Sequence, residues 1–473
     1  MTIGMKFIVA DARPIAHDND FDTNNRAYVP EVWAQESLMV LEENMVASNL
    51  VHRAFSNEVA SYGDVVNTRR PGTFVAKRKI SSDDVTIQDA EATKVPVKLN
   101  QHFHTSFVIK DDEMSKSFKD LVEEFLAPAI RSIAQEMDKA ILAQVYQFTG
   151  NSVGSLGTDP GKSTVIAANT LMNNNKVPGG LGMRNFILTP GAEGALLDVS
   201  DFTKVNEAGD NGLALEQASL GNKFGFNFYM DQNAPSIAAT QTVQTAAINN
   251  GNIAKGSTEL TIDTTSDTLI TGQWCTIAGD MVPQLITVVD GAPTTTMTIY
   301  PGLKTAVADG AVITIYPQGA IDQDVATTGY AADYVKDIDV DGFSDAPLVG
   351  QMTSYGIVGA SVDKYGLIGA PTTTSIALDR ETQSAMADNA VLNLGPAGDY
   401  CLAMHPNAIA LVSRPLALVP DGFGARQAVV NYNGLSLRLS MQYEGRGQGL
   451  LVTADMLSGI KVLDTNLGMV MYA

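Results

Sequence analysis

A glycine-rich segment contains residue types that could bind phosphate: Gly157-Thr158-Asp159-Pro160-Gly161-Lys162-Ser163. A phosphate-binding P-loop has the form G-x-x-x-x-G-K-[ST], in which backbone amides and the lysine hold the phosphates. That spacing needs a glycine at position 156, which is Leu156 here. The motif also follows a strand, whereas the residues before this segment predict a helix. We therefore expect a glycine-rich loop without a phosphate-binding role.

Two pairs of residues could begin a metal site or a nucleophile. His102 and His104 are two positions apart on a predicted strand, so both side chains point to one face. No third ligand lies nearby, and the chain has only five histidines. Cys401 and His405 could form a nucleophile and its base, but their spacing places one within a strand and the other at its end. We expect His102 and His104 to lie on the polar face of their strand and Cys401 and His405 to pack. We predict no catalytic residue, no metal site and no cofactor.

Two carboxylate clusters could bind a cation, namely Asp83-Asp84 and Asp111-Asp112-Glu113. Neither has the spacing of an EF-hand loop. Turns and helix caps use the same residue types far more often. We therefore expect structural roles for both clusters.

The one dense basic cluster consists of Arg69, Arg70, Lys77, Arg78 and Lys79. With Phe74 between them, these residues could touch nucleic acid. The cluster falls on an extended segment of an acidic chain, which equally favours charge pairing between subunits. We predict that these five residues make inter-subunit contacts.

The bulk composition excludes several classes of protein. The 473 residues carry a net charge of −21, without the basic stripe of a sequence-reading DNA binder. Only 18% of the residues are charged, which favours a surface largely covered by partners. Two cysteines are too few for a disulfide framework, so we expect a reduced, cytosolic protein. We find no signal peptide and no apolar run of about 18 residues that could cross a membrane.

The elements that position these residues follow from periodicity. Residues 112–148 carry the longest helical pattern, with a capping-box-like start at Ser117 and Asp120 and an end at Gly150. Pro128 falls inside this pattern and predicts a kink. Residues 62–110 predict one long two-stranded excursion, because the stretch from Val95 to Lys110 alternates between apolar and polar residues.

Shorter elements are predicted in the remaining mixed α/β regions. The patterns give strands at 184–188, 224–230, 399–405, 435–443, 459–463 and 467–472, and helices at 190–198 and 406–414. The second helix is predicted because Pro406 would occupy its first position.

An internal repeat marks the region from about 240 to 385. Gly272-Gln273 recurs as Gly350-Gln351, and the six residues from Gly291 to Thr296 recur from Gly369 to Thr374, both at an offset of 78 positions. Residues 260–263 match residues 338–341 in pattern. We therefore predict an all-β insertion of two similar strand sets that share a core as a barrel or sandwich.

Several segments resemble coat proteins of tailed bacteriophages. The C-terminal stretch from Ala403 to Leu416, which reads AMHPNAIALVSRPL, is similar to a hallmark of that family, and so is the stretch from Asp455 to Asp464, DMLSGIKVLD. The order of further matches also fits: Tyr28–Trp33, Thr68–Pro71, and Leu220–Tyr229 followed by Asn233–Pro235. These matches cover most of residues 28–235 and 386–473. The resemblance is to the Hong Kong 97-like fold, especially the short-tailed phage type with an inserted β domain.

The resemblance implies an α+β fold with a defined division of the chain. Residues 1–61 would be an N-terminal arm (N-arm), and 62–110 an extended hairpin (E-loop) that reaches over a neighbour. Residues 111–179 would form a peripheral domain with a long spine helix, which residues 433–473 complete. Residues 180–239 and 386–432 would form an axial domain, interrupted by the all-β insertion at 240–385.

The resemblance also implies a function and partners. The chain would be a major capsid protein and not an enzyme, assembled in the bacterial host cytoplasm and located in the virion. It would form pentamers and hexamers of an icosahedral shell around a double-stranded DNA genome. Its partners would be itself, a scaffolding protein, a portal protein, possible decoration proteins and, without sequence specificity, the packaged DNA. The acidic balance would let that DNA slide along the wall.

Three other interpretations remain open. An encapsulin-like compartment shell has the same fold, but would not usually carry a large β insertion here. A surface adhesin or tail protein would fit the threonine-rich β region, although no secretion signal is visible. An enzyme would need a catalytic constellation, and the sequence offers none.

Overall fold

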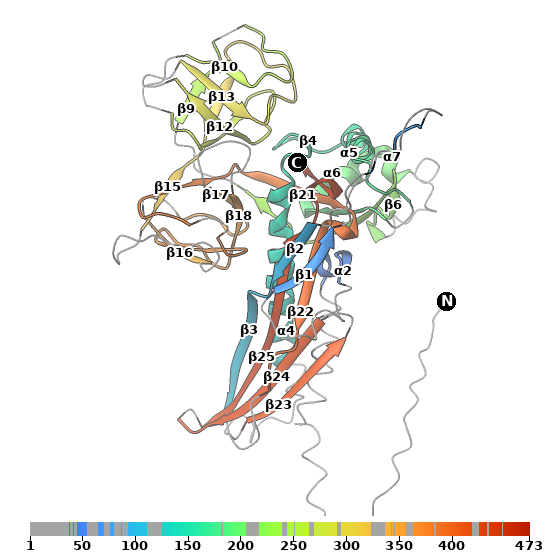
Figure 1. Cartoon of the computed structure of the whole chain (residues 1–473), viewed down its shortest axis with the longest axis vertical. Helices are drawn as coiled ribbons and strands as arrows, with labels where there is room; N and C mark the ends of the chain where they lie inside the picture. The colour runs from blue at the N-terminus through green and yellow to red at the C-terminus, as the bar shows by residue number, and fades with distance from the viewer. Residues whose placement is uncertain are drawn as a thin grey trace, which may run out of the picture.

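A computed structural model shows a mixed α+β protein (Figure 1). It describes residues 37, 41, 45–53, 65–70, 76–79, 87, 93–110, 125–180, 183–204, 217–238, 244–249, 251–263, 269–290, 295–322, 336–341, 343, 346–355, 363–382, 385–418, 425–432, 435–446 and 448–473. Four regions can be followed in Figure 1: a long arm, a compact lobe beside the C-terminus, and two β units.

The arm is an antiparallel sheet built on one long central strand, β25 (Gly449–Val462). Strand β24 (Leu435–Glu444) pairs with the first half of β25, and strand β3 (Gln101–Lys110) pairs with its residues 449–458. Strand β22 (Ile409–Arg414) pairs with its second half, and β23 (Ala425–Tyr432) pairs with β24. Alternate residues of β24 are buried, as the period of two requires.

Helix α4 (Ala127–Leu142) lies against this sheet and continues as the 3-10 helix η3 (Ala143–Phe148). Its buried residues Ile130, Ile133, Met137 and Ile141 recur every three or four positions. Pro128 lies in the first turn of α4, directly after π-helical residues 125–126. Proline is tolerated in the first turn of a helix, and the kink predicted at Pro128 stays a prediction. The predicted capping box at Ser117 lies outside the described residues.

The hairpin differs from the single excursion predicted for 62–110. Strand β1 (Val65–Arg70) pairs with β2 (Thr93–Lys98) as a two-stranded ribbon. Strand β3 belongs instead to the arm sheet, with ten paired positions on β25. Its alternating side chains explain the difference, because they pack on the helix: Phe107 stacks on Phe125 with ring centroids 6.1 Å apart, and Thr105 hydrogen-bonds Ser132 at 3.0 Å.

Two further predictions near the C-terminus were wrong in part. Only Pro406–Ala408 is helical, as the 3-10 turn η4, and the rest of the predicted helix is strand β22. The four consecutive apolar residues from Ile409 to Val412 are almost fully buried, and such a run favours a strand covered on both faces. The strand predicted at 459–463 starts ten residues earlier, at Gly449, because β25 has partners along its whole length.

The compact lobe contains a mixed sheet that separates two cores. Its order is β4 (Ser152–Gly154), β26 (Gly468–Tyr472), β21 (Gly398–Met404), β5 (Asn185–Leu188), β7 (Phe226–Met230) and β6 (Asn222–Lys223), with β8 (Ser236–Ile237) also on β21. Along β21, Leu402 and Met404 face the core shared with α4, whereas Cys401 and Ala403 face the helices of the lobe. These helices are α5 (Lys162–Asn174), α6 (Pro190–Asp198) and α7 (Ser200–Thr203).

The repeat region contains two β units with one strand order. The first β unit comprises β9 (Gln244–Ala247), β10 (Glu259–Thr261), β11 (Trp274–Ile277), β12 (Gln284–Val289), β13 (Thr296–Tyr300) and β14 (Val312–Ile315). The second β unit comprises β15 (Gln318–Ile321), β16 (Asp337–Asp341), β17 (Met352–Tyr355), β18 (Asp363–Ile368), β19 (Ser375–Leu378) and β20 (Val391–Leu394). The second is a closed barrel. The first unit is a six-stranded sheet with β9 and β10 at its edges. A β-bridge between Ile248 and Ile262 joins the ends of these two strands, at the position where the second unit closes into a barrel.

The two units repeat local contacts as well as strands. The backbone N–H of Ile270 donates to Gln273 Oε1 at 2.9 Å, and that of Leu348 donates to Gln351 Oε1 at 3.0 Å. The two donors are 78 positions apart, as are the two acceptors. Each unit nevertheless has its own apolar core, so the expectation of one shared core was wrong. Six strands are enough to enclose apolar side chains on their own when they close on themselves.

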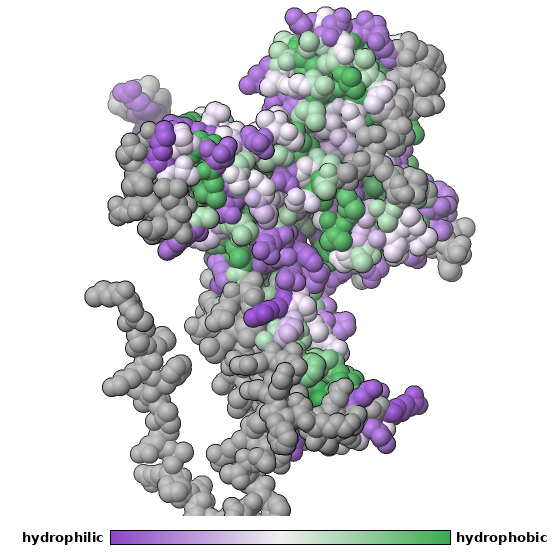
Figure 2. All heavy atoms as spheres, turned by 180° about the vertical axis from the view of Figure 1, so that it is seen from behind, coloured by the Kyte–Doolittle hydropathy of each residue, from purple (hydrophilic) through white to green (hydrophobic). Residues whose placement is uncertain are grey.

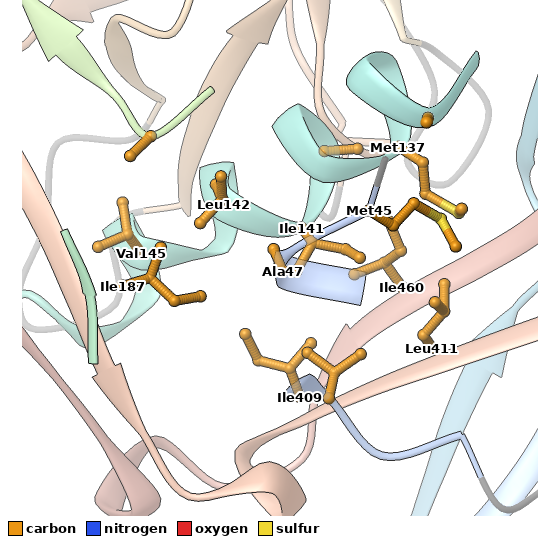
Figure 3. Packing of buried hydrophobic residues seen from close by; sticks show 14 of the residues in the cluster. Met45, Ala47, Met137, Ile141, Leu142, Val145, Ile187, Ile409, Leu411 and Ile460 are labelled. Atoms are coloured by element: carbon orange, nitrogen blue, oxygen red, sulfur yellow. The ribbon is translucent and has the colours of Figure 1, made fainter. Parts of the chain in front are cut away.

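The largest core joins all these regions. Figure 3 shows Met137, Ile141 and Leu142 of α4 packed against Met45, Ala47, Ile409, Leu411 and Ile460. Trp274 and Met352, at equivalent positions of the two β units, also belong to this core. The helix is thus the element against which the arm, the lobe and the β units are fixed.

Candidate functional site: the surroundings of helix α4

Two carboxylates from different regions converge on the start of the short helix α2 (Ala47–Leu50). Asp138 of α4 is fully buried, and it accepts hydrogen bonds from the backbone amides of Val46 at 2.8 Å and Ser48 at 3.0 Å. The Ser48 hydroxyl donates to the same carboxylate at 2.6 Å. Helix α2 has no side-chain cap of its own, so Asp138 satisfies amides that would otherwise be unpaired.

Asp231 is the second carboxylate, and it follows strand β7. It is 3% exposed and accepts a hydrogen bond from the Asn233 amide at 2.8 Å. Burial raises the pKa of Asp138 to about 6, and the nearby charge of Asp231 adds to the rise. Burial also raises the pKa of Asp231. These two acids therefore hold protons at a higher pH than exposed aspartates do.

A buried polar network joins the second β unit to the helix. Asp379 Oδ2 accepts a hydrogen bond from Gln144 Nε2 at 2.7 Å and pairs with Arg380 Nη1 at 3.0 Å. Its other oxygen accepts from the Gly366 amide at 3.0 Å. Gln147 of η3 donates to the carbonyl of Lys364 at 2.7 Å. Because these polar groups are buried, loss of one partner would leave the other without a hydrogen bond in a site of low dielectric, at a cost in stability.

Contacts between the two β units lie next to this network. Trp274 of the first unit donates its indole N–H to Ser354 Oγ of the second at 2.7 Å. The Lys364 ammonium lies 5.4 Å from the centre of the Trp274 ring, as a cation–π contact. Desolvation lowers the pKa of Lys364 to about 8.

The turn at Asp280 and Met281 of the first β unit is hydrogen-bonded to the lobe. The Leu156 amide donates to the Met281 carbonyl, and the Ser155 hydroxyl to the Asp280 carbonyl, both at 2.9 Å. The buried Asp280 carboxylate holds this turn by accepting from Gln284 Nε2 at 2.7 Å and from the Thr305 amide at 2.8 Å.

The predicted contact residues lie on the hairpin. Lys77, Arg78 and Lys79 are exposed. Arg69 and Arg70 lie on β1, opposite Lys94 and Thr93 of β2. The inter-subunit role of these five residues remains a prediction.

The glycine-rich loop holds its lysine in an ion pair. Lys162 Nζ lies 2.6 Å from Asp201 Oδ2, and Gly161 is the N-cap of α5. A short strand, β4, precedes the loop, so the expectation that a helix comes directly before it was wrong. The spacing mismatch at Leu156 is unaffected.

The other candidate residues occupy separate surroundings. His102 and His104 lie on one face of β3 with ring centroids 6.1 Å apart, and His102 Nε2 is 3.4 Å from Asp455. Burial raises the pKa of Cys401 to about 12, which disfavours the thiolate. His405 accepts a hydrogen bond from the Asn407 amide. The acidic clusters at 83–84 and 111–113 lie outside the described residues.

Within the described ranges, no group of three or more histidine, cysteine or carboxylate residues could hold a metal ion. No helix within those ranges is long and apolar enough to cross a membrane.

Sequence reasoning missed the buried acids Asp138, Asp280 and Asp379. Asp138 had a readable signal, because it interrupts the apolar stripe of α4 next to Met137. The other two lie in turns, where aspartate is ordinary.

Comparison with known proteins gives structural neighbours only. No protein-family profile matches the chain, and no curated protein matches it. A structure from Mycobacterium phage Che8 has 12% identity and a TM-score of 0.41, with 90% of each chain covered. The capsid of the Cyanophage P-SCSP1u has 9% identity and a TM-score of 0.41, covering 89% of this chain and 88% of that one. The capsid of Ralstonia phage GP4 has 9% identity and a TM-score of 0.41, covering 90% and 87%.

Proposed function

We propose that the chain is the major capsid protein of a tailed bacteriophage, with a Hong Kong 97-like fold and a duplicated β insertion. In this proposal it is a structural subunit and not an enzyme. Copies form pentamers and hexamers, which join into an icosahedral shell around double-stranded DNA.

The pairing of the two C-terminal segments that resemble phage coat proteins carries this proposal. The first runs from β21 through η4 into β22, and the second lies in β25. Ile409 pairs with Val462 and Arg414 with Leu457, in one uninterrupted antiparallel register. Segments that match a family separately in sequence are therefore neighbours in one structural unit, at the core beside α4.

The shape of the described chain also supports a subunit that needs neighbours. Strands β3 and β23 each have one paired edge within the described residues, and the ribbon of β1 and β2 is marginal as an isolated hairpin. Open edges and thin ribbons are surfaces to which further chains add. Figure 2 shows apolar patches interleaved with polar ones on the first β unit, where Val288 is 58% exposed and Tyr300 44% exposed.

The proposed domain layout uses these elements. The ribbon of β1 and β2 is the extended E-loop, α4 with η3 is the spine helix, and the arm sheet completes the peripheral domain. The compact lobe is the axial domain, which surrounds the centre of each ring. This differs from the layout expected from the sequence, because β4, α5 and β26 of the lobe come from ranges assigned there to the peripheral domain. Heterologous contacts between such lobes form a closed ring when the rotation from one subunit to the next is a whole fraction of a full turn.

A scaffolding protein and a portal protein are the further partners of this assembly, and decoration proteins are optional ones. The net charge of −21 disfavours tight binding of the packaged DNA to the wall.

Light scattering with sedimentation velocity tests the proposal on the full-length chain, with and without a crowding agent. We expect species far above the 50.2 kDa of one chain, in steps that correspond to rings and then shells. A chain that remains monomeric or dimeric under all these conditions would sink the proposal and favour the adhesin or tail-protein interpretation.

A further inference from the structure

The start of helix α2 is held by two carboxylates from other parts of the chain. Asp138 of α4 accepts hydrogen bonds from the amides of Val46 and Ser48, and Asp231 hydrogen-bonds the backbone of Ala47 between them. The first amides of a helix have no partner within the helix itself. Three consecutive residues at the start of α2 are therefore bound by two acids that are far apart in sequence.

The two acids are buried together without a cation in contact with them. Asp138 is fully buried and Asp231 almost so, and neither forms an ion pair with any other described residue. Asp231 Oδ2 also has no hydrogen-bond partner in the described part of the chain, so it can carry a proton without giving up a hydrogen bond. Because two buried negative charges repel each other and are poorly solvated, a proton on this pair stabilises the docked α2.

The charged side chains of α4 near the pair point into open cavities. Arg131 is exposed and borders a cavity of about 250 Å³ beside the turn at Asp231. Lys139 borders a neighbouring cavity of about 190 Å³ and pairs with Glu136 at 2.8 Å. Neither cation is hydrogen-bonded to Asp138 or Asp231 within the described structure, so neither neutralises the pair directly.

The other neighbours of α2 are mostly apolar. Strands β22 and β25 contribute apolar side chains here (Figure 3), namely Ile409, Leu411 and Ile460. The ionisable side chains that follow α2 in the chain are His52 and Arg53. Histidine changes its charge between pH 5 and pH 8, so the contribution of His52 has to be separated from that of the two acids.

We propose that Asp138 and Asp231 form a proton-controlled latch, which holds residues 45–52 on the protein at acidic pH and releases them as the pH rises. A proton on the pair removes the repulsion between the two carboxylates while α2 is docked. When the proton is lost, two charges are buried together, and undocking of α2 exposes them to water. The inference does not depend on the proposed function, because a single copy of the chain is enough.

The direction of the pH effect follows from proton binding. Burial raises the pKa of Asp138 to about 6, and it also raises the pKa of Asp231, whereas a solvated aspartate has a pKa of about 3.9. The docked state therefore binds protons more tightly, so this stabilisation is complete at low pH and is lost as the pH rises through about 6. For Asp138 alone, the docking equilibrium changes by roughly 50-fold between pH 4 and pH 7.

Hydrogen exchange of the full-length chain, followed by mass spectrometry at a series of pH values, tests the latch. Protection factors are corrected for the intrinsic pH dependence of exchange and compared between residues 45–52 and helix α5, which contains no acidic residue. We expect the protection of residues 45–52 to fall by at least roughly 50-fold from pH 4 to pH 7, and that of α5 to change much less. A parallel pH dependence in the two segments would overturn the inference.

Two variants assign the effect to the pair. In Asp138→Asn/Asp231→Asn neither position titrates, so the protection of residues 45–52 should no longer fall with pH, although His52 is unchanged. Asp231→Asn alone keeps the contacts of Asp138 and removes the charge that adds to its raised pKa. The fall in protection should then be smaller and end at a lower pH.

The matched control is Asp341→Asn, on an exposed position of β16, which should behave as the unchanged chain does. A double variant that retains the full pH dependence would assign the effect to His52 or another group and contradict the latch. An Asp231→Asn variant with the pH profile of the unchanged chain would show that the two acids do not act together, and would also contradict it.

Discussion

Ser48 and Asp138 are 90 positions apart in the chain, yet the Ser48 hydroxyl lies 2.6 Å from the Asp138 carboxylate and donates to it. This contact attaches the end of the N-terminal region to the helix at the centre of the molecule. Next to it, the His52 amide donates to the Ile409 carbonyl at 3.1 Å, and the His52 carbonyl accepts from the Leu411 amide at 3.0 Å. Residues 45–52 are thus part of the fold around α4 and β22.

Replacing Asp138 by alanine should destabilise the chain. The substitution leaves the amides of Val46 and Ser48 and the Ser48 hydroxyl without their acceptor. We expect a loss of at least about 2 kcal/mol in the free energy of unfolding at about pH 4, where the folded Asp138 is protonated and its removal relieves no buried charge, because unsatisfied buried donors cost about 1–3 kcal/mol each. Urea unfolding measures it, with the exposed Asp341→Ala as the control. Equal stabilities of the two variants would contradict the capping role.

The pH dependence of stability should also depend on Asp138. Its pKa is raised to about 6 by burial, compared with about 3.9 in an unfolded chain. The folded state therefore binds this proton more tightly, so the free energy of unfolding is highest at low pH and falls as the pH rises from about 4 to about 6. The loss is roughly 3 kcal/mol. Asp138→Asn has no such titrating group, so its free energy of unfolding should not fall over this pH range. If the unfolding free energies of the variant and the unchanged chain vary with pH in parallel, the role of Asp138 is refuted.

Asp379 should be needed to hold the second β unit on the helix. Asp379→Ala removes the carboxylate that accepts from Gln144 and the Gly366 amide and pairs with Arg380. Removal of one partner of a buried ion pair costs about 3–5 kcal/mol, so we expect a loss of that order in urea unfolding. The exposed Asp337→Ala is the control. In a double-mutant cycle with Arg380→Ala, a coupling energy near zero would contradict the pairing.

At Gly459 of β25 there is no room for a side chain. A Cβ atom there would lie 2.2 Å from the carbonyl oxygen of Lys98, at the end of β2. Gly459→Ala should therefore push the ribbon of β1 and β2 away and cost about 1–3 kcal/mol or more. Gly445→Ala, whose Cβ would meet nothing within 4 Å, is the matched control. If both variants unfold at the same urea concentration, the ribbon does not lie against β25 as described.

Sequence periodicity predicted the local elements well where one pattern dominated. The helix predicted at 190–198 is α6, whose Thr189 caps the Ala192 amide at 3.3 Å, and the strand predicted at 435–443 is β24. The repeat at an offset of 78 positions predicted two similar strand sets. The structure has them: β11 and β17, for example, begin at equivalent residues, Trp274 and Met352.

Partner choice was what periodicity could not predict. Strand β3 alternates as well in a hairpin as in a sheet, and its ten paired positions on β25 and the stacking of Phe107 on Phe125 are present only in the folded chain. The same holds for the acids around α4. Asp138 and Asp231 are 93 positions apart, and their common target, the start of α2, is recognisable only in the folded chain.

Electron microscopy of the particles formed by the purified full-length chain tests the central claim most directly. The account predicts closed hollow shells in which averaged views contain both fivefold and sixfold rings of one subunit. Particles without such rings, or a chain that never exceeds a dimer even with a crowding agent, would contradict the claim that this protein is a capsid subunit.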